Sequence, residues 1–112
     1  MTVLAVGDVF GIAGRRPELV AALEAQERAA ATEPGCLRFC FAATIADPDR
    51  FLLVGEWSDQ SALDAHFRTE AFATYQLALD GLLAKPSSMT IHSVSASIRP
   101  VASGVMDPRD AD

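Results

Sequence analysis

From Cys36 to Trp57 the chain reads CLRFCFAATIADPDRFLLVGEW, two apolar runs separated by Asp-Pro-Asp at positions 47–49. Within each run large apolar side chains alternate with smaller or polar ones, a spacing typical of β-strands. Asp and Pro are common in turns, because Pro presets its φ angle and Asp hydrogen-bonds the local backbone. Residues 36–45 and 50–57 are therefore predicted to form an antiparallel hairpin.

Alternation also assigns the two faces of this hairpin. In the first strand, one face carries the bulkier residues Leu37, Phe39, Phe41 and Ala43. The other face carries Cys36, Arg38, Cys40 and Ala42. In the second strand, Trp57 shares a face with Phe51, Leu53 and Gly55, while Glu56 lies with Leu52 and Val54. Both strands thus place apolar side chains on both faces.

The segment before the hairpin predicts a strand and a helix. Thr2–Gly11 is rich in Val, Leu and Phe without helical spacing, which indicates a strand. Pro17 suits a helix start and Pro34 prevents continuation, so the helix is predicted over about Pro17–Thr32. The inward stripe of that helix comprises Leu19, Leu23, Gln26 and Ala30.

After the hairpin, Ser58 or Asp59 can cap a short helix and Thr69 can cap the next. The inward side of the short helix is predicted to hold Ala62, Leu63, His66 and Phe67. The inward side of the helix capped by Thr69 is predicted to hold Phe72, Tyr75, Gln76, Leu79 and Leu82 or Leu83. Met89–Ile98 predicts a last strand, with His92 on the face opposite Met89.

This order of elements predicts an α+β, ferredoxin-like βαββαβ fold, a four-stranded antiparallel sheet with helices on one face. The opposite face would remain apolar and exposed in a monomer, so pairing of two copies into a homodimeric α/β barrel is expected. Residues 1–98 are predicted to form this domain. Residues 99–112 are predicted to be a mobile tail or an arm over the partner subunit.

Composition excludes several classes of function. The net charge of −6 and the lack of a Lys/Arg cluster argue against binding to nucleic acid. Apolar runs are too short for a membrane span and the start does not read as a signal peptide, so a cytoplasmic protein is expected. On a strand, Cys36 and Cys40 would lie about 13 Å apart, too far for a disulfide.

No cofactor is expected either. The glycines lack the spacing of a dinucleotide or phosphate-binding loop, and no Gly-x-Ser-x-Gly motif is present. The two histidines, His66 and His92, do not belong to a cluster with metal-ligand spacing. The chemistry must then rest on ordinary side chains and on the substrate.

Four short motifs accompany the hairpin: Glu33-Pro34-Gly35-Cys36, Gly55-Glu56-Trp57, Ala62-Leu63-Asp64-Ala65-His66 and Thr69-Glu70-Ala71-Phe72. With them, residues 3–95 resemble the antibiotic biosynthesis monooxygenase family, small dimeric α+β barrels that oxidise aromatic substrates without flavin, haem or metal. The resemblance implies a cofactor-independent monooxygenase acting on a phenol, quinol or anthrone with molecular oxygen. The family's usual Pro-His-Phe after Thr69 is absent here, so this chain lacks the second histidine.

The resemblance implies that His66 and Trp57 are the catalytic residues. His66 matches a histidine common in the family, and histidine exchanges protons near neutral pH. A histidine that caps the helix end or is hydrogen-bonded within the packing would also explain this residue. Trp57 could stack on a planar substrate or donate its N–H, although packing in the core would also explain it. Haem-degrading relatives carry an iron-ligating histidine on the third helix, where this chain has Tyr75 and Gln76, so haem is not expected.

Five further residues are predicted to bind substrate: Tyr75, Phe72, Arg38, Asp8 and His92. Tyr75 could hydrogen-bond a substrate oxygen, or serve only in the core beside Phe72. Arg38 could steady an oxyanion, or pair with Glu56 across the hairpin. Two other functions remain open on this fold: an isomerase of a small phosphorylated or lactone substrate, and a non-catalytic ligand-binding or stress-response dimer.

Overall fold

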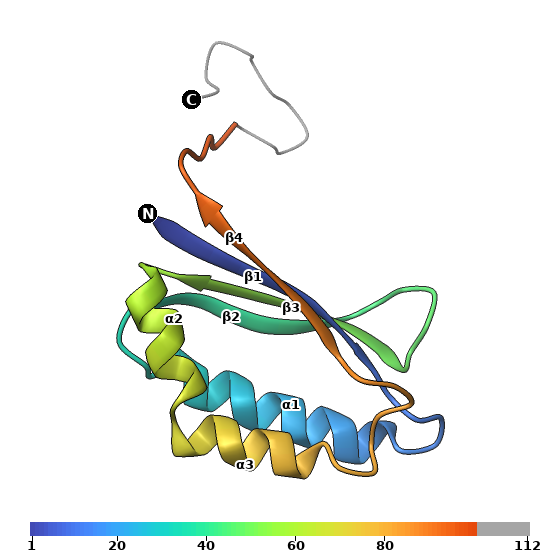
Figure 1. Ribbon diagram of the computed structural model, residues 1–112. Coiled ribbons are helices and arrows are strands. Elements are labelled where there is room, and N and C mark those ends of the chain that lie inside the picture. The colour runs from blue at the N-terminus through green and yellow to red at the C-terminus, as the bar shows by residue number, and fades with distance from the viewer. Residues whose placement is uncertain (101–112) are drawn as a thin grey trace.

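The computed structural model describes residues 1–100, which form a four-stranded antiparallel sheet with three helices on one face (Figure 1). In chain order the elements are β1 Thr2–Phe10, α1 Arg16–Ala31, β2 Cys36–Ala43, β3 Arg50–Trp57, α2 Gln60–Phe67, α3 Glu70–Ala78 and β4 Ser88–Val94. The strands lie in the order β2-β3-β1-β4, and the predicted ferredoxin-like arrangement is confirmed. Most of the predicted tail, 99–112, lies outside the described residues.

The β2–β3 hairpin forms as predicted, with one correction at its start. A bulge between Cys36 and Arg38 places Cys36 opposite Trp57, so Cys36 packs on the helix side of the sheet. Leu37, predicted to share a face with Phe39, is instead 58% exposed. A bulge inserts one extra residue into a strand and therefore inverts the faces of the residues on one side of it. Simple alternation could not reveal this shift.

Caps define the two short helices. Asp59 accepts a hydrogen bond from the Ala62 N–H at the start of α2, and Thr69 accepts one from the Phe72 N–H at the start of α3. These side chains satisfy amide groups that have no partner within the helix. The helix was predicted to carry its apolar face as far as Leu82 or Leu83, but α3 ends at Ala78. Leu82 is still buried, through the turn that follows the helix.

The described residues form two buried apolar clusters between helices and sheet. One contains Val9, Leu19, Leu23, Phe51, Leu79 and Leu82. The other contains Val3, Ala30, Trp57 and Leu63. Helix α1 contributes to both, with Leu23 in the first and Ala30 in the second. Gln26 lies between these two positions on α1 and is 2% exposed. A buried polar side chain thus lies between the two apolar clusters.

The opposite face of the sheet is covered by none of the helices (Figure 1). Strand register places Val6, Val54 and Cys40 side by side across its centre. Val6 and Leu52 are each 37% exposed there, as predicted for a sheet that is apolar on both faces. Within residues 1–100, no helix is long and apolar enough to cross a membrane.

Gly35 provides a test of the turn that precedes β2. Its φ is +82°, and a Cβ atom added there would lie 2.6 Å from the Cβ of Ala62. We expect Gly35→Ala to lower the free energy of unfolding by about 2–4 kcal/mol, from the left-handed backbone and the clash together. Urea denaturation would measure it.

Gly14→Ala is the matched control. Gly14 also has a positive φ, +87°, but an added Cβ would meet no atom within 4 Å among the described residues. Its substitution should reduce stability by only about 1 kcal/mol. Equal losses for the two variants would contradict the predicted crowding at Gly35.

Candidate functional site

A cavity of about 570 Å³ lies between the helices and the sheet. Its walls are mainly apolar and aromatic, and include Phe39 and Phe41 of β2, Leu53 of β3, and Phe72, Tyr75 and Leu79 of α3. Polar groups enter from α1 and α2 through Gln26 and His66. Such a space, apolar with a few polar groups, is typical of a small-molecule site.

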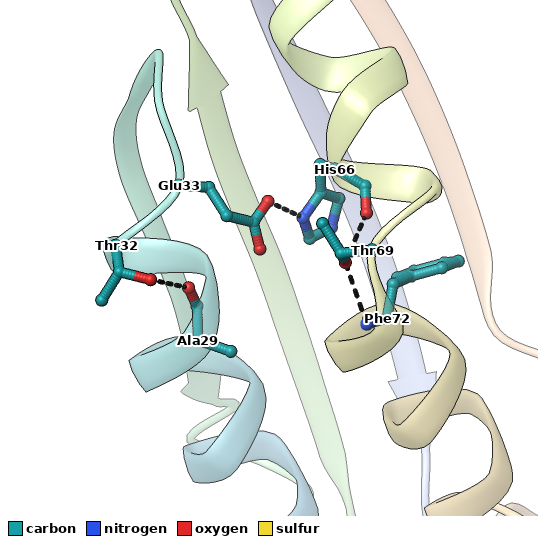
Figure 2. A network of polar contacts seen from close by, with 6 residues as sticks. All are labelled: Ala29, Thr32, Glu33, His66, Thr69 and Phe72. Atoms are coloured by element: carbon teal, nitrogen blue, oxygen red, sulfur yellow. Dashed lines mark hydrogen bonds and ion pairs between the residues drawn. The ribbon is translucent and has the colours of Figure 1, made fainter.

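His66 lines this cavity, and its imidazole pairs with Glu33 (Figure 2). The His66 Nδ1 lies 2.8 Å from Oε1 of Glu33, and the imidazole side chain is 3% exposed. Because a carboxylate can only accept a hydrogen bond, Nδ1 carries the proton and Nε2 of the neutral ring keeps its lone pair. Nε2 points away from Glu33 and is available as a proton acceptor.

The backbone around His66 is fixed by Thr69. The Thr69 hydroxyl donates to the His66 carbonyl at 2.8 Å and accepts from the Phe72 N–H at 3.1 Å (Figure 2). One side chain thus joins the end of α2 to the start of α3. This link sets Phe72 beside His66, with ring centroids 5.3 Å apart.

Trp57 lies against the same imidazole. The two ring centroids are 4.8 Å apart, and Trp57 is completely buried. Its indole Nε1 has no hydrogen-bond partner among residues 1–100. A Cβ added at Gly55 would lie 3.3 Å from Nε1 and 3.4 Å from the Phe39 ring. The glycine therefore leaves room for the indole N–H beside a residue that lines the cavity.

Tyr75 lies in the opposite wall, near Phe41, with ring centroids 6.0 Å apart. Burial raises the pKa of its hydroxyl to about 12, because the charged phenolate is poorly solvated there. The hydroxyl is thus a neutral hydrogen-bond donor at physiological pH.

This shift predicts an alkaline dependence of stability. The Tyr75 pKa rises from 10.0 in the unfolded chain to about 12 in the fold, so its contribution is complete below pH 10 and is lost as pH rises toward 12. The chain has one tyrosine, so tyrosinate absorbance reports this group alone. We expect the native titration midpoint to lie well above that of urea-unfolded protein. Coincident midpoints would contradict burial of the hydroxyl, and Tyr75→Phe serves as the blank.

Comparison with known proteins places this chain in a family. Residues 2–77 match the family model described as antibiotic biosynthesis monooxygenase. The chain belongs to that family. An uncharacterised protein of Synechocystis is 26% identical over 93 residues, which cover 83% of this chain. The chain spans 63% of the length of that relative.

Solved structures of similar proteins show the same fold. A Deinococcus radiodurans protein, provisionally named an antibiotic biosynthesis monooxygenase, has a TM-score of 0.83 at 21% identity, covering 89% of this chain and 99% of its own. A Mycobacterium tuberculosis protein has a TM-score of 0.80 at 20% identity, covering 87% and 98% of the two chains.

Of the predicted site residues, His66, Phe72 and Tyr75 line one cavity, and Trp57 packs against the His66 ring. The other three are placed differently. Arg38 is opposite Glu56 and His92 is opposite Leu4, in register positions on the uncovered face of the sheet. Asp8 reaches the cavity's rim, but its carboxylate binds Arg50 at 2.7 Å.

Two polar residues of the candidate site were not predicted from the sequence: Glu33 and Gln26. Glu33 belongs to the Glu-Pro-Gly-Cys turn, but its partner His66 lies 33 positions further along the chain. Gln26 did leave a signal, as the single polar residue on the apolar stripe of α1. Within residues 1–100, no three His, Cys, Asp or Glu side chains gather as a metal-binding group.

Proposed function

We propose that this protein is a cofactor-independent monooxygenase that oxidises a phenol, quinol or anthrone-like compound with molecular oxygen. The observation that carries the proposal is the Glu33–His66 pair beside an apolar, aromatic-walled cavity. A carboxylate that orients a histidine fixes its tautomer and stabilises the imidazolium formed when the histidine takes a proton. Membership of the family supports the same chemistry.

The reaction needs only one proton acceptor from the protein. Nε2 of His66 removes a proton from the substrate and leaves an electron-rich carbanion. The carbanion transfers one electron to oxygen, the radical pair combines into a peroxide, and loss of water leaves the new carbonyl group. In an anthrone, the CH₂ group and one O₂ molecule thus become C=O and H₂O.

Neighbouring side chains would hold the substrate for this step. The rings of Phe39 and Phe72 flank His66 at centroid distances of 5.5 and 5.3 Å and offer faces for a planar ligand. The Trp57 N–H and the Tyr75 hydroxyl are donors for substrate oxygens. Apolar walls exclude water from the carbanion and so limit side reactions.

Oxygen uptake tests the proposal directly. Metal-stripped protein would be mixed with dithranol or menadiol, and uptake compared with the autoxidation of each compound alone. We expect enzyme-dependent uptake, with dithranol and O₂ converted to the anthraquinone and water, and menadiol and O₂ converted to menadione and hydrogen peroxide. Uptake no faster than the blank, with folded protein, would overturn the proposal and favour an isomerase or a non-catalytic binding protein.

We further propose that the uncovered sheet face joins two copies into a homodimer. Val54 lies at the centre of that face, opposite Val6 and Cys40. An aspartate there would place a charge in the interface, so Val54→Asp should convert a dimer to a monomer. Light scattering coupled to size exclusion would measure the mass.

Ala73→Asp is the matched control for this variant. Ala73 is exposed on α3, on the helical side of the sheet, and the same charge there should leave the mass unchanged. A monomeric wild-type protein at high concentration would contradict the proposed assembly.

A further inference from the structure

The amide of Gln26 is buried in the described structure with both of its polar atoms unpaired. Its side chain is 2% exposed, yet neither Oε1 nor Nε2 has a hydrogen-bond partner among residues 1–100. Burial of an unpaired amide is unfavourable, because the group gives up its hydrogen bonds to water. A methionine or leucine would suit this position on α1 better if packing were its only role.

Gln26 borders the cavity, so a bound molecule could supply the missing partners. The residue lines the same cavity as His66 and Phe39. Nε1 of Trp57, which also has no partner among residues 1–100, lies near Phe39, but Trp57 is not part of the cavity wall. Of the buried polar atoms without a partner in this part of the chain, those of Gln26 belong to a residue that lines the cavity. The oxygens of a ligand in this space would satisfy them.

The chemistry of an amide specifies what Gln26 can recognise. Oε1 accepts a hydrogen bond and Nε2 donates one, from adjacent atoms in one plane. The matching ligand presents a hydroxyl donor and an oxygen acceptor side by side. Two oxygens on neighbouring ring positions meet this requirement, whereas two oxygens on opposite sides of a ring cannot both reach one amide.

The charges of the cavity favour an uncharged ligand. Charged residues among those that line it, apart from the bound Asp8, are Asp80 and Lys85, both exposed near the α3–β4 connection. His66 is paired with Glu33, and Tyr75 keeps its proton. Glu33 offsets any positive charge on His66, so an anionic oxygen at this end of the cavity would find no net positive charge to compensate for its lost hydration.

We infer that Gln26 determines ligand specificity by binding two adjacent oxygen substituents of an uncharged aromatic compound, one of them a hydroxyl. The inference rests on the proposed function in taking this cavity as the substrate site. It adds that ortho-dioxygenated rings bind in preference to rings with a single oxygen. It also assigns the recognition of that pair to α1, whereas His66 on α2 removes the proton.

Calorimetric titration under argon tests this without turnover. The probes are 2,3-dihydroxynaphthalene and 2-naphthol, which differ by one hydroxyl. We expect wild-type protein to bind the diol at least about tenfold more tightly, because a site built for a hydroxyl discriminates against a ligand that lacks it. Gln26→Met should reduce the preference to about twofold or less, and Gln26→Leu should do the same.

Stability measurements separate recognition from packing. Gln26→Met removes two unpaired polar atoms from the interior, so its Tm should equal or exceed that of wild type. Gln60→Met is the control, since Gln60 is an exposed glutamine that does not line the cavity. The Gln60 variant should keep both the preference for the diol and the wild-type Tm.

Three results would overturn the inference: no preference in wild type, a preference retained in Gln26→Met, or a fall in Tm with both probes weakened equally. The oxygen assay distinguishes this failure from that of the proposed function. Oxygen uptake without a Gln26-dependent preference refutes the specificity role alone. A Gln26-dependent preference without uptake supports that role and refutes the oxidation.

Discussion

Replacing His66 with asparagine is expected to lower kcat by about 10²–10⁴-fold, the usual contribution of a positioned acid or base. The asparagine amide can donate to Glu33 from near the position of Nδ1, so the buried carboxylate keeps a partner. No group then remains at the position of Nε2 to accept the substrate proton. Oxygen uptake at saturating substrate would measure the loss.

His92→Asn is the matched control for this prediction. His92 is the other histidine of the chain and lies on the exposed edge strand β4, opposite Leu4. Its substitution should change kcat less than about twofold, since a side chain outside the cavity takes no part in the proton transfer. An unchanged kcat in folded His66→Asn protein would show that Nε2 is not the base. In that case the role of the Glu33–His66 pair would be purely structural.

Trp57→Ala is expected to lower the free energy of unfolding by about 3–5 kcal/mol, a large part of the stability of a domain of this size. Trp57 is 0% exposed and packs with Val3, Ala30 and Leu63. Truncation would leave a cavity beside His66 that the surrounding strands and helices cannot close. Urea denaturation followed by circular dichroism suits the measurement, because the variant has no tryptophan left to fluoresce.

Two substitutions bracket this result. Trp57→Phe keeps most of the packing and removes an N–H that has no partner among residues 1–100, so it should reduce stability by only about 1–2 kcal/mol. Leu77→Ala, at a position 78% exposed, should stay within about 0.5 kcal/mol of wild type. A loss in Trp57→Ala no larger than that in Leu77→Ala would contradict the central place of the indole in the core.

Most of the fold could be predicted from the sequence, because its signals are local. Each signal depends only on residues a few positions away. Examples are the Asp-Pro-Asp turn, the alternation within 50–57 and the caps at Asp59 and Thr69. The bulge at Cys36 was missed since it depends on how β2 registers against β3. The early end of α3 could not be predicted, because Leu79 and Leu82 are buried beyond the helix and their spacing extends its apolar pattern.

For the candidate site as well, some features could be predicted from the sequence and others could not. Sequence alone singled out His66, Trp57, Phe72 and Tyr75, whose residue types and spacing mark an inward, aromatic surface. It could not pair Glu33 with His66, because the chain must close 33 residues between them. Nor could it tell that Asp8 binds Arg50, 42 positions away, instead of facing a substrate.

Hydrophobic spacing and local hydrogen bonding in the sequence thus specify the set of elements and their inward faces. Tertiary packing specifies which polar atoms meet. Gln26 is one position on an amphipathic helix until packing buries it between two clusters, without a hydrogen-bond partner among residues 1–100. Hydrogen bonds require contact within a few ångströms, and contacts between distant segments exist only once the whole core has formed.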